Sequence, residues 1–321
     1  MAQNDTFKDY FVAEFVEAYQ DGVMDRREAL KRLAALTGSM GAAVALLAGC
    51  APAAPPVASP TAAVPTAGPP TAMPTAVAGP GVSPDDPAIT ARRVEFPGPA
   101  GALMAYFAHP RGSGPYPTVL VCHENQGLIE PTLDIARRYA KAGYAALAVD
   151  LLSRQGGADK FTEPAQRTGA LGQTPAPEYV KDWQAGLKWA QEQSVVRKDR
   201  VGFTGFCFGG GITWLLILNT PGIRAAVPYY GRIPPEDELA KVPSLQTAVL
   251  GIYGGNDPNV NAGIPVIEEA MAQAGKTFEK IIYEGAPHAF FNDRNPMRYH
   301  EASAKDAWPK TLAWFDRYLR V

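Results

Sequence analysis

Residues 33–84 carry no charged side chain, and within residues 51–80 nearly two thirds of the positions are proline or alanine. Proline fixes φ and lacks a backbone donor, so a stretch of this composition forms neither a core helix nor a central strand. It favours extended polyproline II segments, which act as a semi-rigid spacer. The chain therefore divides into a leader at residues 1–50, a Pro/Ala/Thr-rich linker at 51–88 and one foldable domain at 89–321. That last part is long enough to bury a large core.

Charge is distributed unevenly between the leader and the rest of the chain. Residues 1–50 hold five Lys or Arg and seven Asp or Glu, which leaves 25 of each sign in the remainder, so its net charge is zero. A neutral body has no basic field for nucleic acid, and we expect no nucleic-acid partner. Only one apolar stretch could cross a bilayer, which excludes a polytopic membrane protein. Three cysteines cannot form a disulfide framework.

The first 25 residues have the pattern of an acidic, partly amphipathic helix. Aromatic side chains recur at spacings of three and four, at Phe7, Tyr10, Phe11, Phe15 and Tyr19. A helix surrounded by solvent is the simpler interpretation. A helix that docks on another surface is the alternative.

Export signals follow this helix. The sequence around Arg26 and Arg27 resembles the twin-arginine export motif, and the uncharged segment at 33–48 is shorter than a bilayer-spanning helix. Leu-Ala-Gly-Cys at 47–50 resembles a bacterial lipobox, in which Cys50 would become the lipidated first residue. These signals predict a protein anchored by lipid to the outer face of the bacterial cytoplasmic membrane. An uncleaved membrane anchor is the alternative, and both would tether the domain.

Strand and helix patterns alternate through residues 89–321. Runs of β character predict a leading hairpin at 91–96 and 102–108, followed by nearly continuous apolar strands at 118–122, 145–149, 201–204, 248–253 and 278–283. Continuous apolar runs are typical of strands buried on both faces of a parallel sheet. Helical periodicity falls at 132–142, 177–193, 212–218, 264–274 and 302–319. We therefore expect an α/β domain, with a mostly parallel central sheet and helices on both faces.

The strand at 201–204 runs into Gly-Phe-Cys-Phe-Gly-Gly-Gly at 205–211 and then into a helix. This order is that of the nucleophile elbow of the α/β-hydrolase fold, in which a strand leads through Gly-x-nucleophile-x-Gly into a helix. Here Cys207 stands at the position of the nucleophile. Side chains at Gly205 or Gly209 would clash in such a turn. The helix N-terminus favours the thiolate form of Cys207. A buried structural cysteine at a tight turn is the alternative.

The catalytic acid and histidine of this fold follow the nucleophile in that order. Asp257 comes directly after the strand at 248–253, and His288 lies beyond the last strand. The alternatives are an aspartate that shapes the turn before a proline and a solvent-facing histidine. In the catalytic interpretation His288 takes the thiol proton and Asp257 orients its imidazole. The thiolate attacks an ester carbonyl, and an acyl-thioester forms and is then hydrolysed.

The loop after the strand at 118–122 supplies the remaining catalytic candidates. In this fold it gives one oxyanion-hole amide, and the residue after the nucleophile gives the other. The candidates are the backbone N–H groups of Asn125 and Phe208. The same loop holds Glu124, either a part of the site or a surface acid.

These motifs together resemble the dienelactone hydrolase family. The resemblance covers residues 89–321 and rests on five features. They are Glu124 before the oxyanion loop, Gly-x-Cys-x-Gly-Gly, Tyr-Tyr-Gly at 229–231, Asp257 and Pro-His-Ala-Phe at 287–290. It implies a monomeric, cofactor-free carboxylic ester hydrolase that opens an enol-lactone ring. It also implies that Cys207 rests neutral near Glu124 until substrate displaces that carboxylate.

Substrate recognition departs from this family pattern. The family binds a substrate carboxylate with two arginines, and Arg154 matches the first, with a surface ion pair as its alternative role. Asn292 stands at the position of the second. Tyr230 is a further substrate-binding candidate, or else a core tyrosine. Because the second arginine is missing, we expect the substrates to be other small esters or lactones.

Two other classes of function remain. An exported binding lipoprotein could keep the fold without catalysis, although Cys207, Asp257 and His288 are all present. A thiol redox protein would need a Cys-x-x-Cys pair, which the chain lacks. Cys122 is expected to be a buried, inert thiol. The spacing of histidines and cysteines predicts no metal site.

Overall fold

The computed structural model describes residues 6–20, 24–48 and 81–320, and its centre is an eight-stranded sheet. The strands are β1 (Ile89–Gly98), β2 (Gly101–Pro110), β3 (Tyr116–Cys122), β4 (Ala145–Val149), β5 (Val196–Phe206), β6 (Ile223–Tyr229), β7 (Ala248–Asn256) and β8 (Phe278–Pro287). Their order in the sheet is β1-β2-β4-β3-β5-β6-β7-β8. The first two strands pair antiparallel with each other, β2 pairs antiparallel with β4, and every later pair is parallel.

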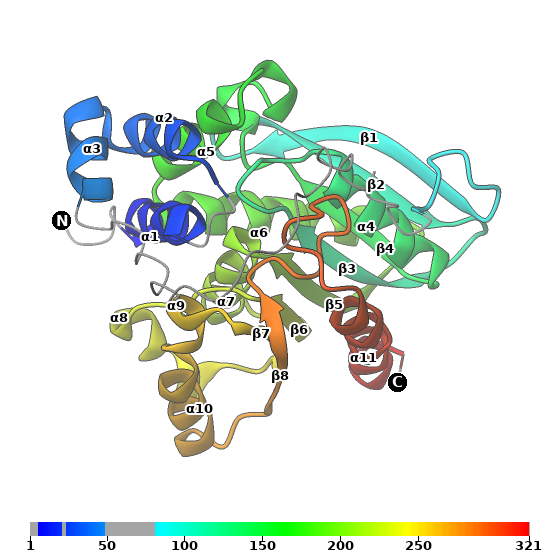
Figure 1. The fold of residues 1–321 in the computed structure, drawn as a ribbon. Coiled ribbons are helices and arrows are strands. Elements are labelled where there is room, and N and C mark those ends of the chain that lie inside the picture. The colour runs from blue at the N-terminus through cyan, green and yellow to red at the C-terminus, as the bar shows by residue number, and fades with distance from the viewer. Residues whose placement is uncertain (1–5, 21–23, 49–80, 321) are drawn as a thin grey trace, which may run out of the picture.

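Helices cover both faces of this sheet (Figure 1). They are α1 (Thr6–Gln20), α2 (Arg26–Thr37), α3 (Met40–Ala48), α4 (Glu130–Lys141), α5 (Pro164–Gly172), α6 (Ala176–Glu192), α7 (Phe208–Asn219), α8 (Glu236–Leu239), α9 (Pro258–Asn261), α10 (Ile264–Gln273) and α11 (Glu301–Leu319). Helices α4 and α11 share one face, where the Tyr139 ring meets Trp308 and Phe315. Helices α6 and α7 pack together on the other face. The predicted α/β-hydrolase fold is confirmed.

The central strands are buried because their side chains meet helices on both sides. Every residue of β4 is buried, and so are all residues of β3 after Tyr116. The carboxyl ends of the parallel strands meet at one edge of the sheet, where ligands bind in open α/β sheets. Cys207, Asp257 and His288 directly follow β5, β7 and β8, so the topology gathers them at this edge.

One central strand, β6, was absent from the predicted set. It pairs in parallel with both β5 and β7. Its sequence contains Arg224, which is exposed, and Pro228. A charge and a proline inside a short run obscure a strand pattern, because proline is found mostly at sheet edges. The other predicted strands are confirmed, with ends that extend by up to five residues.

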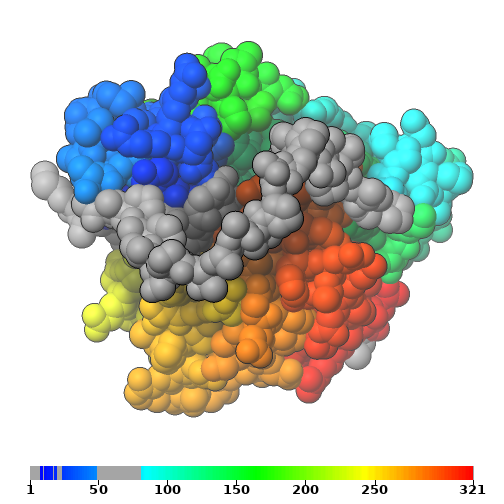
Figure 2. Space-filling model, viewed as in Figure 1, coloured from blue at the N-terminus to red at the C-terminus, as the bar shows by residue number. Residues whose placement is uncertain are grey.

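The leader is not surrounded by solvent, so the simpler interpretation of the first helix is wrong. Helix α1 contacts α2 and α5, and α2 contacts α3 and α5. Phe11 and Phe15 of α1 are buried in the main core cluster, together with Leu33 and Leu36 of α2. In the space-filling view the N-terminal helices lie against the segment that contains α5 (Figure 2). Helix α1 therefore packs against the body of the protein, and whether it also offers a docking surface to a partner stays a prediction.

Two glycines of α5 allow α2 to approach closely. A Cβ built at Gly172 would lie 2.5 Å from Leu36 Cδ2, and one at Gly169 would lie 3.0 Å from Ala35 Cβ. The uncharged segment at 33–48 is not one helix, because α2 ends at Thr37 and Gly38 caps it in the left-handed conformation. Within the described ranges, no helix combines the length and the apolar character needed to cross a membrane. Cys50 and most of the linker lie outside those ranges.

Candidate active site

The turn between β5 and α7 holds Cys207 in a strained conformation, with φ 56° and ψ −117°. A Cβ built at Gly205 would lie 2.1 Å from the Gly209 carbonyl oxygen, and one at Gly209 would lie 2.6 Å from the His123 carbonyl oxygen. Both are far inside a normal contact distance, so only glycine fits at these positions. The prediction that side chains at Gly205 and Gly209 would clash in this turn is therefore confirmed. The strain marks a residue whose position matters for function.

Asp257 and His288 are in direct contact. Nδ1 of His288 lies 2.7 Å from Oδ2 of Asp257, and both side chains are buried. The other oxygen, Oδ1, accepts a hydrogen bond from the backbone N–H of Val260 at the start of α9. Asp257 thus both shapes its turn and orients the imidazole. The buried Nε2 of His288 has no hydrogen-bond partner among the described residues.

The Cys207 thiol lies beside His288 and beside a residue of the leader. An imidazole nitrogen of His288, the thiol and a carboxylate oxygen of Glu14 lie within 4.8 Å of one another. Burial, followed by the charge of Glu14, raises the pKa of Cys207 to about 12, against the lowering effect of His288. Cys207 is thus a neutral thiol at rest. The helix N-terminus favours the thiolate, but burial and Glu14 act in the opposite direction, in keeping with the neutral resting thiol that the family resemblance implies.

His288 has the properties of a base that becomes charged during reaction. Burial lowers its pKa, but the Asp257 carboxylate and Cys207 raise it by more, so the net shift is well above the usual value. A buried histidine with this partner accepts a proton readily. The geometry and the shift together support proton transfer from the thiol to the imidazole.

Glu124 lines the same cavity but has a different partner from the one expected. Its Oε2 accepts a hydrogen bond from Asn292 Nδ2 at 2.7 Å, while the Cys207 thiol donates to Glu14 Oε2 at 3.4 Å. Removal from water raises the pKa of Glu124 to about 7, against the lowering effects of Asn292 and His288. At neutral pH this carboxyl group is therefore poised to gain or lose a proton.

The two oxyanion-hole candidates flank the nucleophile. Phe208 is the first residue of α7, where backbone N–H groups have no acceptor within the helix. Asn125 lines the cavity, and its side-chain amide donates to Glu14 Oε1 at 2.8 Å. Its carbonyl oxygen accepts from the Thr168 hydroxyl, which fixes the loop. The roles of the two backbone N–H groups stay predictions.

Tyr230 lies behind the site rather than on its wall. It is fully buried, its ring centroid is 5.2 Å from that of His288, and its φ is 35°. Burial raises the pKa of its hydroxyl well above the usual value, with further contributions from Glu124 and Cys207. These neighbours place the hydroxyl close to the catalytic groups. The structure thus favours support of His288 over direct substrate contact.

Arg154 is engaged in ion pairs with α6. Its guanidinium lies 2.8 Å from Asp182 Oδ1 and 3.1 Å from Glu178 Oε2. It is not among the residues that line the catalytic cavity. The structure therefore favours the ion-pair alternative for Arg154 over substrate binding.

The other histidines and Cys122 have local structural roles. His123 Nε2 accepts a hydrogen bond from the Leu151 backbone, and His300 Nδ1 pairs with the Ser303 hydroxyl at the start of α11. His109 Nδ1 contacts the Pro110 carbonyl oxygen. Cys122 is fully buried, and burial raises the pKa of its thiol. This is the inert thiol that was expected.

The catalytic cavity has a volume of about 570 Å³ and lies between the leader helices and the carboxyl edge of the sheet. Cys207, His288, Glu124 and Glu14 line it, and so does Arg298. Arg298 is buried, and its guanidinium makes no hydrogen bond or ion pair with a residue of the described ranges. It is a buried cationic group on the wall of the catalytic cavity. Sequence comparison with the family pattern pointed to Arg154 instead.

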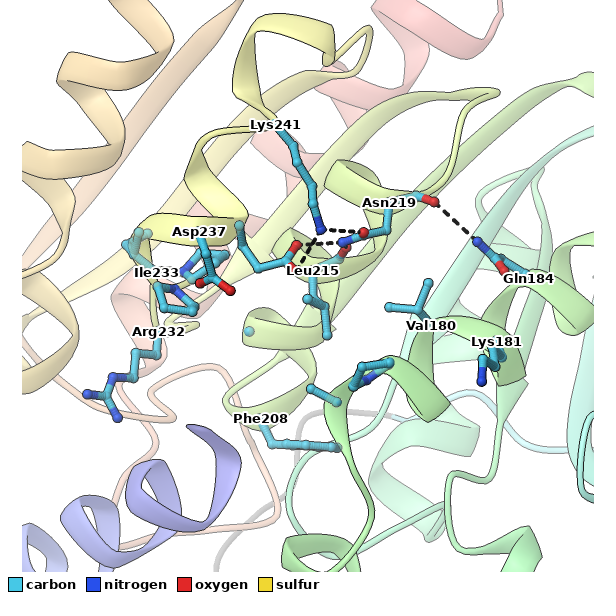
Figure 3. Close-up of a pocket in the computed structure, with 16 residues that line it drawn as sticks. Val180, Lys181, Gln184, Phe208, Leu215, Asn219, Arg232, Ile233, Asp237 and Lys241 are labelled. Carbon is cyan, nitrogen blue, oxygen red and sulfur yellow. Dashed lines mark hydrogen bonds and ion pairs between the residues drawn. The ribbon is translucent and has the colours of Figure 1, made fainter. Parts of the chain in front are cut away.

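A second cavity of about 330 Å³ lies between α6, α7 and residues 232–241 (Figure 3). Val180, Leu215 and Ile233 give it apolar walls. On its polar side the Lys241 ammonium group donates to Asn219. Phe208 lines it, but Cys207 does not. It therefore offers no nucleophile, and the chemistry belongs to the other cavity.

Glu14, Cys207 and His288 are also the kinds of side chain that bind metal ions. Sequence spacing did not predict this group, because Glu14 and Cys207 are 193 positions apart. Nδ1 of His288 is held by Asp257, as in a hydrolytic triad. Cys207 and His288 fit the nucleophile and base of that triad, whereas Glu14 lies outside it and contacts the thiol.

The model of the Dienelactone hydrolase family matches residues 103–319. The chain belongs to the dienelactone hydrolase family. Two relatives, from Methylorubrum extorquens and Escherichia coli strain K12, carry the name “Putative carboxymethylenebutenolidase”. Each is 35% identical over 246 residues, which covers 74% of this chain and 84% or 90% of the relative. Membership of this family confirms the prediction of an enzyme of the carboxylic ester hydrolase class.

Solved structures agree with this assignment. A crystal structure described as a “Putative Dienelactone Hydrolase” from Klebsiella pneumoniae is 34% identical and has a TM-score of 0.66. The match covers 72% of this chain and all of that chain. A dienelactone hydrolase-like promiscuous phosphotriesterase from metagenomic libraries is 25% identical with a TM-score of 0.64, and 72% of this chain covers 99% of it. Both support the dienelactone hydrolase fold for the domain.

Proposed function

We propose that this protein is a cysteine-dependent hydrolase of small carboxylic esters or lactones, acting as a monomer without a cofactor. Cys207 is the nucleophile, His288 the general base and acid, and Asp257 the group that orients His288. The observation that carries the proposal is the 2.7 Å contact of His288 Nδ1 with Asp257, with Nε2 left for the nearby thiol. A non-catalytic binding protein would have no use for this arrangement at a strained elbow.

The reaction follows from these positions. Nε2 of His288 takes the thiol proton, and the sulfur forms a bond to the substrate carbonyl carbon while the carbonyl oxygen becomes an oxyanion. The backbone N–H groups of Phe208 and Asn125 stabilise that charge. The oxyanion collapses, the carbon–oxygen bond to the alcohol breaks, and His288 returns the proton to the departing oxygen. Water then attacks the acyl-thioester with His288 as base, which releases the carboxylate and restores the thiol.

The cavity sets the substrate class. About 570 Å³ accommodates a small ester or lactone. The buried Arg298 and the exposed Arg294 supply positive charge at the cavity, whereas Asn292 donates to Glu124 rather than to a substrate carboxylate. These positions differ from the two-arginine pattern of the family. We therefore propose small lactones and esters, with anionic ones held through Arg298.

Trapping the acyl group on Cys207 tests the proposal. After brief mixing of the full chain with p-nitrophenyl acetate, we expect intact-mass spectrometry to find one acetyl group and peptide mapping to place it on Cys207. The Cys122→Ala variant is the matched control and should acylate equally, because that thiol is buried away from the cavity. Release of p-nitrophenol with no adduct under any quench would contradict the thioester route.

We also propose that the enzyme is exported and held at the outer face of the cytoplasmic membrane through lipid on Cys50. Arg26 and Arg27 support this, because both are exposed at the start of α2 while the apolar positions Ala29 and Leu33 are buried. We expect Cys50→Ala to move the protein from the membrane pellet to the soluble fraction on cell fractionation. Continued pelleting of an uncleaved variant would support a membrane anchor in place of lipidation.

A further inference from the structure

The N-terminal helix α1 supplies a side chain, Glu14, that contacts the nucleophile. Glu14 Oε2 accepts a hydrogen bond from the Cys207 thiol at 3.4 Å, and Glu14 Oε1 accepts one from Asn125 Nδ2 at 2.8 Å. One carboxylate thus spans the space between the nucleophile and the loop expected to stabilise the oxyanion. Ester hydrolysis leaves a carboxylate in that same space, so Glu14 stands where the product would stand.

Apolar contacts hold α1 in this position. The Phe11 ring is 5.3 Å from the Phe208 ring, next to the nucleophile, and Phe15 is also buried. Leu36 of α2 packs at Gly172 of α5, close to Phe11. Burial of large apolar side chains stabilises the packing of the helices that carry them. Several such contacts make the docked leader a stable part of the full chain.

We propose that residues 6–48 are an intramolecular inhibitor of this hydrolase, with Glu14 occupying the acyl position beside Cys207. The inference rests on the proposed function, since it assigns Glu14 to the same site. With α1 in place the Cys207 side chain is only 2% exposed, so a substrate carbonyl cannot reach the sulfur without displacing Glu14. The charge of Glu14 also raises the pKa of Cys207, after burial, and keeps the thiol protonated.

Glu14 lies in the leader, N-terminal to the predicted cleavage site before Cys50, so the contact with Cys207 can be removed by processing. Cleavage before Cys50 would remove Glu14 with the rest of the leader. The same processing step that exposes Cys50 for lipidation would therefore open the active site. The uncleaved chain would react slowly, and the rate would rise once the leader was removed at the outer face of the membrane.

Two variants of the full, uncleaved chain separate this inference from its alternatives. Glu14→Ala removes the carboxylate from the site, and Leu36→Asp loosens the leader at α5 without touching the catalytic cavity. Asp9→Ala is the matched control, because it removes the same charge from an exposed position of α1. The readouts are the rate of Cys207 alkylation by iodoacetamide and kcat/KM for p-nitrophenyl acetate.

We expect Glu14→Ala and Leu36→Asp to raise the alkylation rate about tenfold, because both remove a negative charge from beside the thiol and open the way to the sulfur. Both should raise kcat/KM, and Asp9→Ala should match the wild type. Unchanged alkylation in Glu14→Ala and Leu36→Asp would overturn the inference. A loss of turnover in Glu14→Ala would also overturn it, because Glu14 would then assist the reaction.

Alkylation separates the two proposals. Faster alkylation in both variants, with no ester turned over by any of them, would leave the inhibitory leader standing and refute the proposed hydrolase. Equal rates of ester turnover in the wild type and in Glu14→Ala would refute inhibition by the leader, while the proposed hydrolase activity would stand.

Discussion

Cys207→Ala should remove ester hydrolysis almost completely. Loss of the nucleophile in enzymes of this kind lowers kcat by about four to six orders of magnitude. The expectation is strong here because Cys207 is the one thiol that lines the catalytic cavity, among the residues that the structure describes. The measurement is initial-rate hydrolysis of p-nitrophenyl acetate by wild type and variant, purified in the same way.

Two comparisons make this result specific. Cys207→Ser should also be nearly inactive, since a hydroxyl group is far less acidic than a thiol and His288 would have to deprotonate it. Cys122→Ala should keep wild-type rates. Far-ultraviolet circular dichroism should be unchanged in Cys207→Ala, because the substitution removes one atom beside a cavity. Rates near the wild type in Cys207→Ala would exclude Cys207 as the nucleophile.

The sequence was sufficient to predict the catalytic domain because its signals are local. The glycines around Cys207, the proline after Asp257 and the loop after β8 each mark a turn at the end of a strand. In a parallel sheet all such turns meet at one edge, so chain order alone brings Cys207, Asp257 and His288 together. The contact of His288 with Asp257 is a consequence of that topology.

Contacts between distant segments could not be predicted in this way. Nothing in the sequence of α1 indicates that Glu14, rather than another acid of the same helix, reaches the thiol. The contact depends on how α2 packs across Gly169 and Gly172 of α5, which is a property of the assembled surface. The family resemblance implied a neutral Cys207 near Glu124, but the contribution of Glu14 to that state could not be predicted from the turn.

The strained backbone of the molecule supports the same picture of the site. Among the described residues, the non-glycine residues with positive φ are Cys207, Tyr230 and Ala289. Each is a member of the site or a direct neighbour of one, since Tyr230 packs on His288 and Ala289 follows it. Such conformations persist only where the surrounding structure holds them. The fold therefore holds Cys207 in place, and it also holds the two residues that adjoin His288, Tyr230 and Ala289.

Asp257→Asn should reduce kcat by about 10⁴-fold while leaving the fold intact. The asparagine Oδ1 can still accept from the Val260 N–H, so the turn into α9 is preserved. Its Nδ2 group would replace the carboxylate oxygen that now lies 2.7 Å from His288 Nδ1. An amide donates to Nδ1 and so places the imidazole proton on Nε2, where the nitrogen can no longer take the thiol proton. KM should change little, because Asp257 is not on the cavity wall.

The pH dependence of the variant and a buried control test this reason. Without a base, the rate should rise with pH as the thiol, whose pKa burial raises to about 12, ionises unaided. Asp134→Asn makes the same change at a buried aspartate of α4 that pairs with Arg138 away from the site. It should lower the thermal unfolding temperature and leave kcat of the folded enzyme unchanged. A flat pH profile in Asp257→Asn, or an equal loss of kcat in Asp134→Asn, would mean that Asp257 acts through stability rather than through the tautomer of His288.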